Sequence, residues 1–135
     1  RIGTPSDAAE FRTAWVGRAQ GMLSGLGLEV EAVAANDPFF GRAGKLLANE
    51  QLSSNLKTEL VVHVYGDDHP ADAIASCNLA EDHFGRNFSL TLPDGSTAHS
   101  ACVGFGLERI TLALLSVHGT DPAQWPATVR ETLFP

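Results

Sequence analysis

One stretch decides the fold of this chain: Ala101-Cys-Val-Gly-Phe-Gly-Leu-Glu-Arg-Ile-Thr-Leu-Ala-Leu-Leu115. Residues 97–104 alternate in the period-two pattern of a strand, and one face of that strand carries only small side chains. After Gly106 the apolar positions recur with helical spacing and cover most of the helix circumference, so we expect the helix to be buried. The stretch therefore predicts a strand that runs directly into a core helix.

Arg109 stands on this helix and needs an explanation. A guanidinium keeps its proton, so on a buried helix it requires an anion within reach. One source is a structural ion pair with Glu108 or another carboxylate. The other is a phosphate or carboxylate ligand, held by the planar guanidinium through two parallel hydrogen bonds. Gly104 and Gly106 favour a ligand, because they let the backbone approach an anion at the start of the helix.

The composition predicts one globular domain. The chain has 135 residues, of which 44% are apolar, and it contains no repeat or low-complexity linker. It lacks a signal-peptide pattern and any apolar run of about 18 residues, so we expect a cytoplasmic protein with no membrane partner. The net charge of −7, with nine Lys and Arg residues in no basic run, disfavours tRNA as a partner. The chain starts at Arg1 and its only methionine is Met22, so we expect a fragment or processed product.

Two cysteines, Cys77 and Cys102, leave several chemistries open. Without a secretory signal, two reduced thiols are expected rather than a disulfide. A zinc site built from both cysteines with His83 and His99 lacks the paired spacing of such ligands, so we favour one strand cysteine that contributes to a site with ligands from elsewhere. Nothing marks either cysteine as an activated nucleophile.

A first helix is predicted from Pro5 to about Gly25. Thr4 is suited to cap its start, and proline fits its first turn. We interpret Arg12 and Arg18 as solvated charges on its outer side. One apolar stripe should pack this helix on the core: Phe11, Trp15, Ala19, Met22, Leu23 and Leu26.

Alternating segments predict an α+β fold, in which an antiparallel sheet of about five strands carries helices on one face. The predicted strands are residues 28–34, 57–65, 73–78, 87–92 and 97–104. The fourth strand should turn Phe88, Leu90 and Leu92 inward and join the fifth through a turn at Pro93-Asp-Gly95. Further helices are predicted over residues 43–54 and 127–133, the last one packed through Trp125, Val129 and Leu133.

Neither solvent exposure nor packing explains five polar residues: Glu59, Ser76, Asn78, Cys102 and Arg109. His83 and His99 are weaker members of the same set. All stand on predicted strands or at strand ends, which would bring an arginine, a carboxylate and small polar groups into one site. Such a site suits a nucleotide and an amino acid, because the carboxylate would hold an ammonium group or Mg²⁺ and the arginine a polyphosphate.

These motifs resemble those of a known family. Gly104-Phe-Gly-Leu-Glu-Arg109 resembles the third signature motif of class II aminoacyl-tRNA synthetases, a strand–helix unit that ends on an ATP-binding arginine. With four further motifs, nearly all 135 residues resemble the amino acid:carrier protein ligases, which are seryl-tRNA-synthetase-like proteins without the tRNA-binding arm. Those motifs are Asn36-Asp-Pro-Phe-Phe-Gly41, Leu56-Lys-Thr-Glu-Leu60, Ser76-Cys-Asn78 and Asp82-His-Phe-Gly85.

The resemblance implies an enzyme that activates glycine or alanine with ATP to an aminoacyl-adenylate. It then passes the aminoacyl group to the phosphopantetheine thiol of a carrier protein, without tRNA, and acts as a homodimer when complete. The implied cofactors are ATP with Mg²⁺ and a catalytic Zn²⁺ that binds the substrate amino group. By position, Cys102 matches a zinc ligand, Arg109 the catalytic ATP arginine and Asn78 the amino-acid pocket. The positions implied to contact ATP are Glu59, Ala73, Ile74, Ala75, Ser76 and Arg109.

The sequence also departs from the family pattern. Related seryl enzymes carry a glutamate for ATP and Mg²⁺ near position 73, where Ala73 stands here, so backbone groups or Asp72 would have to serve. The resemblance makes residues 1–135 the C-terminal part of a class II synthetase-like catalytic domain, with the other zinc ligands expected before Arg1. We therefore expect this segment alone to be inactive and to hold zinc poorly. The rivals are a seryl-tRNA synthetase core and a non-catalytic, partner-binding relic.

The insertion that contains Phe39, Phe40 and Arg42 is a candidate docking surface for the carrier protein. Adjacent aromatic residues in a turn more often pack beneath a loop as a satellite cluster. Both readings are open from the sequence.

Overall fold

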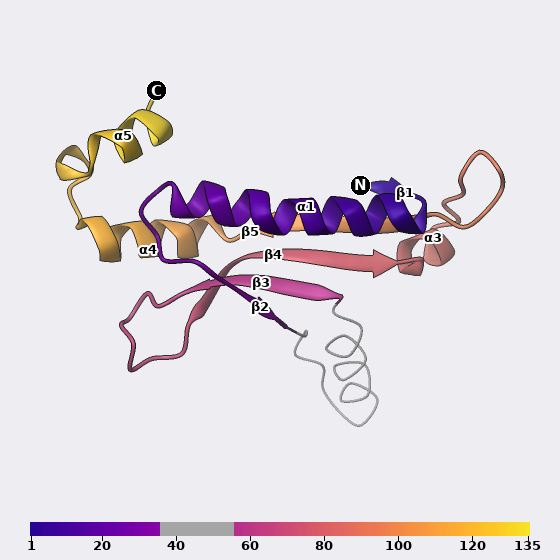
Figure 1. The fold of residues 1–135 in the computed structure, drawn as a ribbon, viewed down its shortest axis with the longest axis horizontal. Helices are drawn as coiled ribbons and strands as arrows, with labels where there is room; N and C mark the ends of the chain where they lie inside the picture. Colours follow the sequence, from indigo (N-terminus) through magenta and orange to yellow (C-terminus); the bar gives the residue numbers. More distant parts are fainter. Residues whose placement is uncertain (36–55) are drawn as a thin grey trace.

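The computed structural model describes residues 1–35 and 56–135. These residues form an antiparallel sheet of five strands in the order β1-β5-β4-β3-β2 (Figure 1). The strands are β1 (Ile2–Gly3), β2 (Glu31–Ala34), β3 (Lys57–Val62), β4 (Asp72–Glu81) and β5 (His99–Phe105). The predicted α+β fold with an antiparallel sheet is therefore confirmed, although β1 was not predicted. The predicted turn at 36–41 and helix at 43–54 lie outside the described residues.

The helices lie along the sheet and beyond its end (Figure 1). α1 runs lengthwise over β4 and β5 and contacts both strands. α4 starts directly after β5, as the motif stretch predicts. Their bounds are α1 (Pro5–Ser24), α3 (His83–Asn87), α4 (Leu107–His118) and α5 (Ala127–Leu133), with a 3₁₀ turn at Pro122–Gln124. Within the described residues, no helix has the length and apolarity needed to cross a bilayer.

The start of α1 is fixed by a capping box. The backbone N–H of Asp7 donates to Thr4 Oγ1 at 3.1 Å, and the backbone N–H of Thr4 donates to Asp7 Oδ2 at 2.9 Å. Pro5 occupies the first turn, where its missing N–H costs no hydrogen bond. The helix ends at Gly25, and Gly27 follows with φ +82°, a conformation that favours glycine. The predicted start and end of this helix are confirmed.

One contiguous core joins α1, the sheet, α4 and α5. Leu60 and Ile74 are fully buried at its centre. Burial of this apolar surface provides the main favourable term for folding. Of the residues predicted to pack α5, Trp125 and Val129 are buried, whereas Leu133 is 36% exposed. The core members are Ala19, Leu23, Leu26, Leu28, Leu60, Val62, Val64, Ile74, Ala75, Ala113, Leu114, Trp125 and Val129.

Two predictions about the faces of α1 are wrong. Met22 is 56% exposed, so the predicted apolar stripe is narrower than expected. Arg12 is not a solvated charge, because its Nη2 donates to Thr58 Oγ1 at 2.6 Å beneath the helix. The long aliphatic stem of an arginine can cross an apolar interface when a polar acceptor lies at its end. Arg18 instead lies over the ring of Trp15, with its Cζ 5.2 Å from the centroid.

The predicted strand at residues 87–92 is also wrong. The chain there completes α3 and turns through Ser89, whose φ is +52°, and only one bridge, Thr91 to Thr97, resembles strand pairing. Phe88 does not point inward but is 68% exposed. Its ring stacks on Phe84 at a centroid distance of 6.1 Å, so helical spacing within α3 explains the pair better than strand alternation.

Two irregularities shift the register of β4. Leu60 pairs with Ala75 but Val61 pairs with Ala73, which leaves Ile74 as an extra residue of β4. A second shift lies between Leu79 and Glu81. The strand consequently changes which side chains face the helices along its length.

Replacing Thr4 with Ala should lower the free energy of unfolding by about 1 kcal/mol, because the first turn of α1 loses its side-chain cap. Urea unfolding followed by circular dichroism measures this change. Ser6→Ala is the matched control, since Ser6 bonds only to the exposed Glu10 side chain within the described residues. Equal losses in both variants would contradict a specific role for the cap.

Stability should also fall in acid through Asp7. Hydrogen bonds from the side chain and backbone of Thr4 hold the pKa of this carboxyl below its usual value. Its contribution is therefore complete above the unfolded pKa near 3.8 and is lost as the pH falls through the lower folded pKa. Urea midpoints between about pH 2 and 6 should show a smaller acid loss in Asp7→Asn than in the parent protein.

Candidate functional site

The pairing of β3, β4 and β5 brings six predicted or neighbouring site positions onto one face of the sheet. Directly paired residues point to the same side, and side chains alternate along each strand. Asn78 pairs with both Lys57 and Cys102, and Ser76 pairs with both Glu59 and Gly104. We call this surface the site face, defined by Lys57, Glu59, Ser76, Asn78, Cys102 and Gly104. α1 covers the opposite face, where Arg12 reaches Thr58.

Asn78 links the polar residues of β4 and β5. Its Nδ2 donates to Ser76 Oγ at 3.1 Å and to Cys102 Sγ at 3.7 Å. The two N–H bonds of one amide group can thus serve a hydroxyl oxygen and a thiol sulfur at once. The predicted grouping of Ser76, Asn78 and Cys102 is therefore present as a connected set.

Lys57 is a charged residue of the site face that the sequence analysis did not assign. Its Nζ lies 3.1 Å from Glu59 Oε1, and the two side chains are only 12% and 26% exposed. The spacing of residues 57 and 59 indicates that Lys57 shares a face with Glu59, because residues two apart on a strand point to the same side. Glu59 is thus paired with a cation within its own strand.

Arg109 lies at the end of the site face, but its surroundings differ from the prediction. α4 is not buried around most of its circumference, since Leu107, Leu112 and Val117 are exposed, and Arg109 is exposed with them. Its Nη1 donates to the carbonyl of Ala73 at 2.8 Å. Among the described residues Arg109 has no ion-pair partner, so the predicted alternative of a structural pair with Glu108 is wrong.

The four residues of the segment Ala73–Ser76 contribute in different ways near Arg109: some through backbone carbonyls and one through its side chain. Ile74 and Ala75 have their side chains in the core. The carbonyls of Ala73 and Ile74 accept hydrogen bonds from Arg109 and from the N–H of Gly106, respectively. These bonds join the start of α4 to β4. Ser76 is the member whose side chain lies on the site face.

Asp72 lies elsewhere. It pairs with Val62, a core residue, so the register directs it to the face opposite the site. The alternative in which Asp72 reaches into the site in place of a glutamate near position 73 is not supported by this register.

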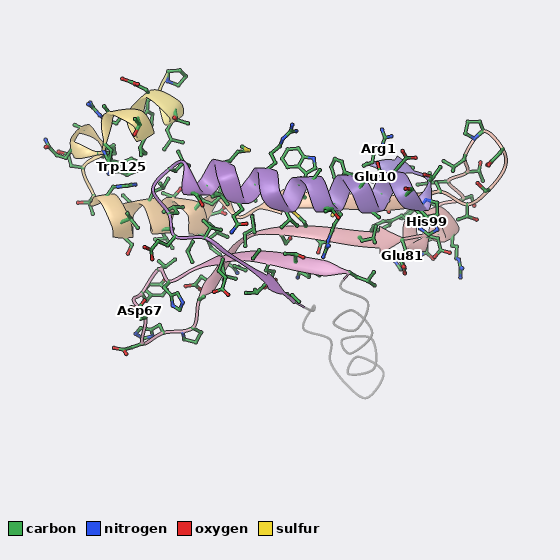
Figure 2. All side chains as sticks on the ribbon, in the orientation of Figure 1. Arg1, Glu10, Asp67, Glu81, His99 and Trp125 are labelled. Carbon is green, nitrogen blue, oxygen red and sulfur yellow. The ribbon has the colours of Figure 1, made fainter. Side chains whose placement is uncertain are left out.

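The two cysteines lie on opposite faces of the sheet. Cys77 is fully buried and pairs with Val103, whereas Cys102 is exposed and pairs with Asn78. This geometry excludes a disulfide or a shared metal ion between them in this fold. Figure 2 places His99 and Glu81 at the far end of the sheet, near α3. In the described parts of the chain, no three His, Cys, Asp or Glu residues gather as a metal site.

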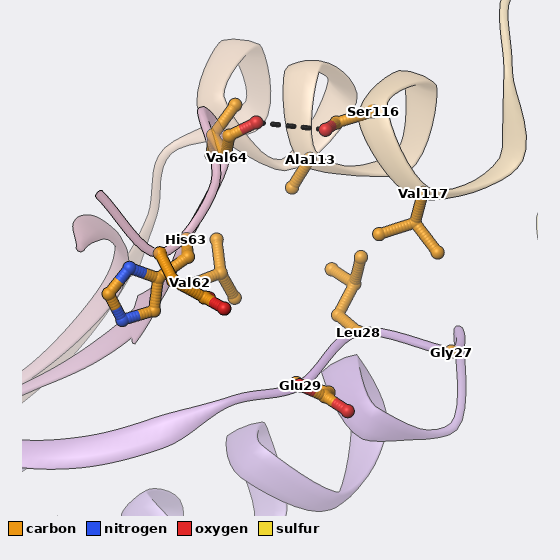
Figure 3. Close-up of a pocket in the computed structure, with 10 residues that line it drawn as sticks. Gly27, Leu28, Glu29, Val62, His63, Val64, Ala113, Ser116 and Val117 are labelled. Atoms are coloured by element: carbon orange, nitrogen blue, oxygen red, sulfur yellow. Dashed lines mark hydrogen bonds between the residues drawn. The ribbon is translucent and has the colours of Figure 1, made fainter. Parts of the chain in front are cut away.

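Among the cavities next to the described part of the sheet, two bear on the site. One of about 370 Å³ adjoins Cys102 and is lined mainly by apolar residues, including Ile2, Phe84, Phe88 and Leu90. The other, of about 250 Å³, lies between α4 and the ends of β3 and α1 (Figure 3). Its wall includes Leu28 and Val117, with Glu29 and His63 at one side (Figure 3). The second cavity contains none of the residues of the site face.

The sequence is similar to those of known ligases. The chain is 41% identical over 132 residues to amino acid–acyl-carrier-protein ligase 1 of Bradyrhizobium diazoefficiens, and 41% identical to ligase 2 of that organism. The resemblance to these ligases is confirmed. The match covers 98% of this chain but only 40% and 39% of the two ligases, so the chain spans about two fifths of their length. No family model matches the sequence.

The chain is also similar, more distantly, to seryl enzymes. The chain is 26% identical over 139 residues to the type-2 serine–tRNA ligase of Methanopyrus kandleri, covering 98% of this chain and 26% of that protein. A chain in the crystal structure of A. aeolicus tRNASec in complex with M. kandleri SerRS superposes with a TM-score of 0.76 at 24% identity. That match covers 98% of this chain and 27% of the other, and it confirms a synthetase-like fold.

The exposure of the two thiols predicts selective modification. Burial raises the pKa of Cys77, and the thiolate is the reactive form. Iodoacetamide at pH 8 should therefore modify Cys102 faster than Cys77, by about tenfold or more, in the folded protein. Peptide mass spectrometry measures both rates, and urea should make them similar. Faster labelling of Cys77 in the native state would contradict the assigned faces.

Proposed function

We propose that this chain is part of an ATP-dependent ligase that activates glycine or alanine and transfers it to a carrier protein. One observation carries the proposal: Cys102, Asn78, Ser76 and Glu59 form one polar face that ends at Arg109, in a chain 41% identical to amino acid–acyl-carrier-protein ligases. The face combines a thiol, amide and hydroxyl groups, a carboxylate and a guanidinium. These are groups that can bind an amino acid at one end and a polyphosphate at the other.

Arg109 is suited to bind the triphosphate. The bond from its Nη1 to Ala73 fixes the guanidinium, whose other N–H groups can donate to phosphate oxygens. Its charge would offset the negative charge that develops on the departing pyrophosphate. Attack of the amino-acid carboxylate on the α-phosphorus forms the acyl–phosphate bond and breaks the bond to pyrophosphate. The adenylate then gives its acyl group to the carrier thiol, with AMP as the leaving group.

Cys102 fits the role of one zinc ligand. It is an exposed thiol on the site face, and the Asn78 amide that donates to its sulfur would orient this ligand. When bound, zinc would supply an open coordination position for the lone pair of the unprotonated substrate amino group. A structural zinc site takes four protein ligands and a catalytic one takes three. The described residues offer one of them, so further ligands must come from outside this set.

The part of the site face proposed to bind the amino acid carries small side chains. Ser76 and Gly104 are paired neighbours and leave space above the sheet for a ligand rather than filling it with side chains. A short amino acid beside Asn78 is consistent with this shape. Mg²⁺ would enter with the phosphates of ATP, since few carboxylates line the face and Mg²⁺ commonly takes phosphate and water oxygens.

The carrier protein is the proposed acyl acceptor, and the insertion with Phe39, Phe40 and Arg42 is its proposed contact. These three residues lie outside the described part of the chain. Arg42→Glu in the complete protein should lower acyl transfer to the carrier while leaving adenylate formation intact, because reversing a charge in a docking surface makes it repel a complementary partner. Separate pyrophosphate-exchange and carrier-acylation assays measure the two steps. Equal loss of both would contradict a docking role.

The alternative is a serine–tRNA ligase core, which the 26% identity to such an enzyme supports. The two functions differ in the first step. Amino-acid-dependent ATP–pyrophosphate exchange in the complete protein, with Zn²⁺ present, should occur with glycine or alanine under the ligase proposal. Exchange with serine alone would favour the alternative. No exchange with any of the three would overturn both and leave a binding module.

Arg109→Ala should lower kcat/KM for pyrophosphate exchange about 10²- to 10³-fold, as for loss of one group that stabilises transition-state charge. Arg109→Lys should restore little, because an ammonium lacks the bidentate geometry. Arg86→Ala is the matched control, since this exposed arginine pairs only with Asp82 within the described residues. If Arg86→Ala lowered kcat/KM as much as Arg109→Ala, the loss would not be specific to Arg109.

A further inference from the structure

Lys57 compensates the negative charge of Glu59 on the site face. Glu59 stands opposite Ser76, in the row of residues between Asn78 and Arg109. If ATP binds there, an unpaired carboxylate would repel its phosphates, and partial burial would make this repulsion stronger than in water. The Lys57 ammonium lies 3.1 Å from Glu59 Oε1, so the structure already supplies the compensating charge.

A metal role for Glu59 is the competing explanation. Mg²⁺ would require the carboxylate to exchange its ammonium partner for the ion. Among the residues that the structure describes, no second and third acidic, histidine or cysteine ligand gathers around it. Both side chains are largely buried, with only 12% of Lys57 and 26% of Glu59 exposed, which also favours keeping the pair together, since separating it would leave one poorly solvated charge.

We infer that Lys57 is a positioning residue that acts through Glu59. It orients the carboxylate along β3 and cancels its charge, so that the second oxygen, Oε2, can accept a hydrogen bond from an uncharged donor of the nucleotide, such as a ribose hydroxyl or an amino group. This inference rests on the proposed function, because it assumes that ATP lies on the site face. It assigns the carboxylate to the nucleoside part of ATP and Arg109 to its phosphates.

A double-mutant cycle tests this role in the complete protein. Lys57→Gln leaves the Glu59 charge uncompensated and should raise KM for ATP about tenfold, with kcat changed by less than about threefold. Lys57→Arg should restore KM, since it retains the charge. The double variant Lys57→Gln/Glu59→Gln should bind ATP better than Lys57→Gln alone, because the repelling carboxylate is gone. Pyrophosphate exchange at several ATP concentrations measures these values.

The salt dependence separates this role from a merely structural one. Raising the ionic strength from about 0.05 to 0.5 M should reduce the KM defect of Lys57→Gln, because salt screens the repulsion between carboxylate and phosphate. Arg86→Gln serves as the control, since it removes another paired cation far along the chain, on α3. Thermal unfolding of each variant verifies that it folds. If Lys57→Gln does not fold, the single variants Lys57→Arg and Glu59→Gln provide the comparison.

Three results would overturn the inference. Additive losses in the double variant would indicate that Lys57 contacts the phosphates directly. An unchanged KM in Lys57→Gln would indicate that the pair is not in the nucleotide site. A shift in the Mg²⁺ requirement of Glu59→Gln that exceeds its effect on KM for ATP would assign Glu59 to the metal. Absence of exchange in the parent protein would instead refute the proposed function, so the two failures are distinguishable.

Discussion

The antiparallel hydrogen bonding of β3, β4 and β5 is the constraint on which the rest of this structure depends. Register decides which side chains of a strand are buried and which are available to a ligand. Here it places Cys77 under α1 and its neighbour Asn78 on the open side, beside Cys102. A displacement of one residue would exchange these roles and bury the polar set. The chemistry of the site is therefore a property of the pairing, more than of any single residue.

Packing of α1 maintains that distinction between the two faces. The helix covers β4 and β5, and its Arg12 reaches across the interface to Thr58 on β3. The opposite face has polar contacts within the sheet itself, among Lys57, Glu59, Ser76, Asn78 and Cys102. One side of the sheet thus packs against α1, while the other carries the polar groups of the site face.

Much of the fold could be predicted from local sequence, and the errors have physical causes. The capping box at Thr4 and the alternation in β3 are local signals, so both were predictable. Phe88 was misassigned because alternating apolar residues can equally belong to a short helix and a turn. α4 was expected to be buried because its composition is apolar, but composition does not specify how much partner surface a helix receives. The grouping of Ser76, Asn78 and Cys102 was predictable from strand alternation, whereas the Lys57 contact with Glu59 required the positions of both side chains.

The extra residue in β4, Ile74, has a consequence for how this sheet tolerates change. On one side of Ile74 this face of the sheet is polar, with Glu59 opposite Ser76, and on the other side it is apolar, with the buried Val61 opposite Ala73. The side chain of Ile74 packs in the core, and its carbonyl accepts a hydrogen bond from the N–H of Gly106. This one residue therefore joins two parts of β4 in which the alternation of side chains is out of step. A conservative replacement there would alter only local volume. Deletion of the residue would turn the side chains of one part of the strand to the other face. Substitutions at this position should therefore be tolerated far more readily than its deletion.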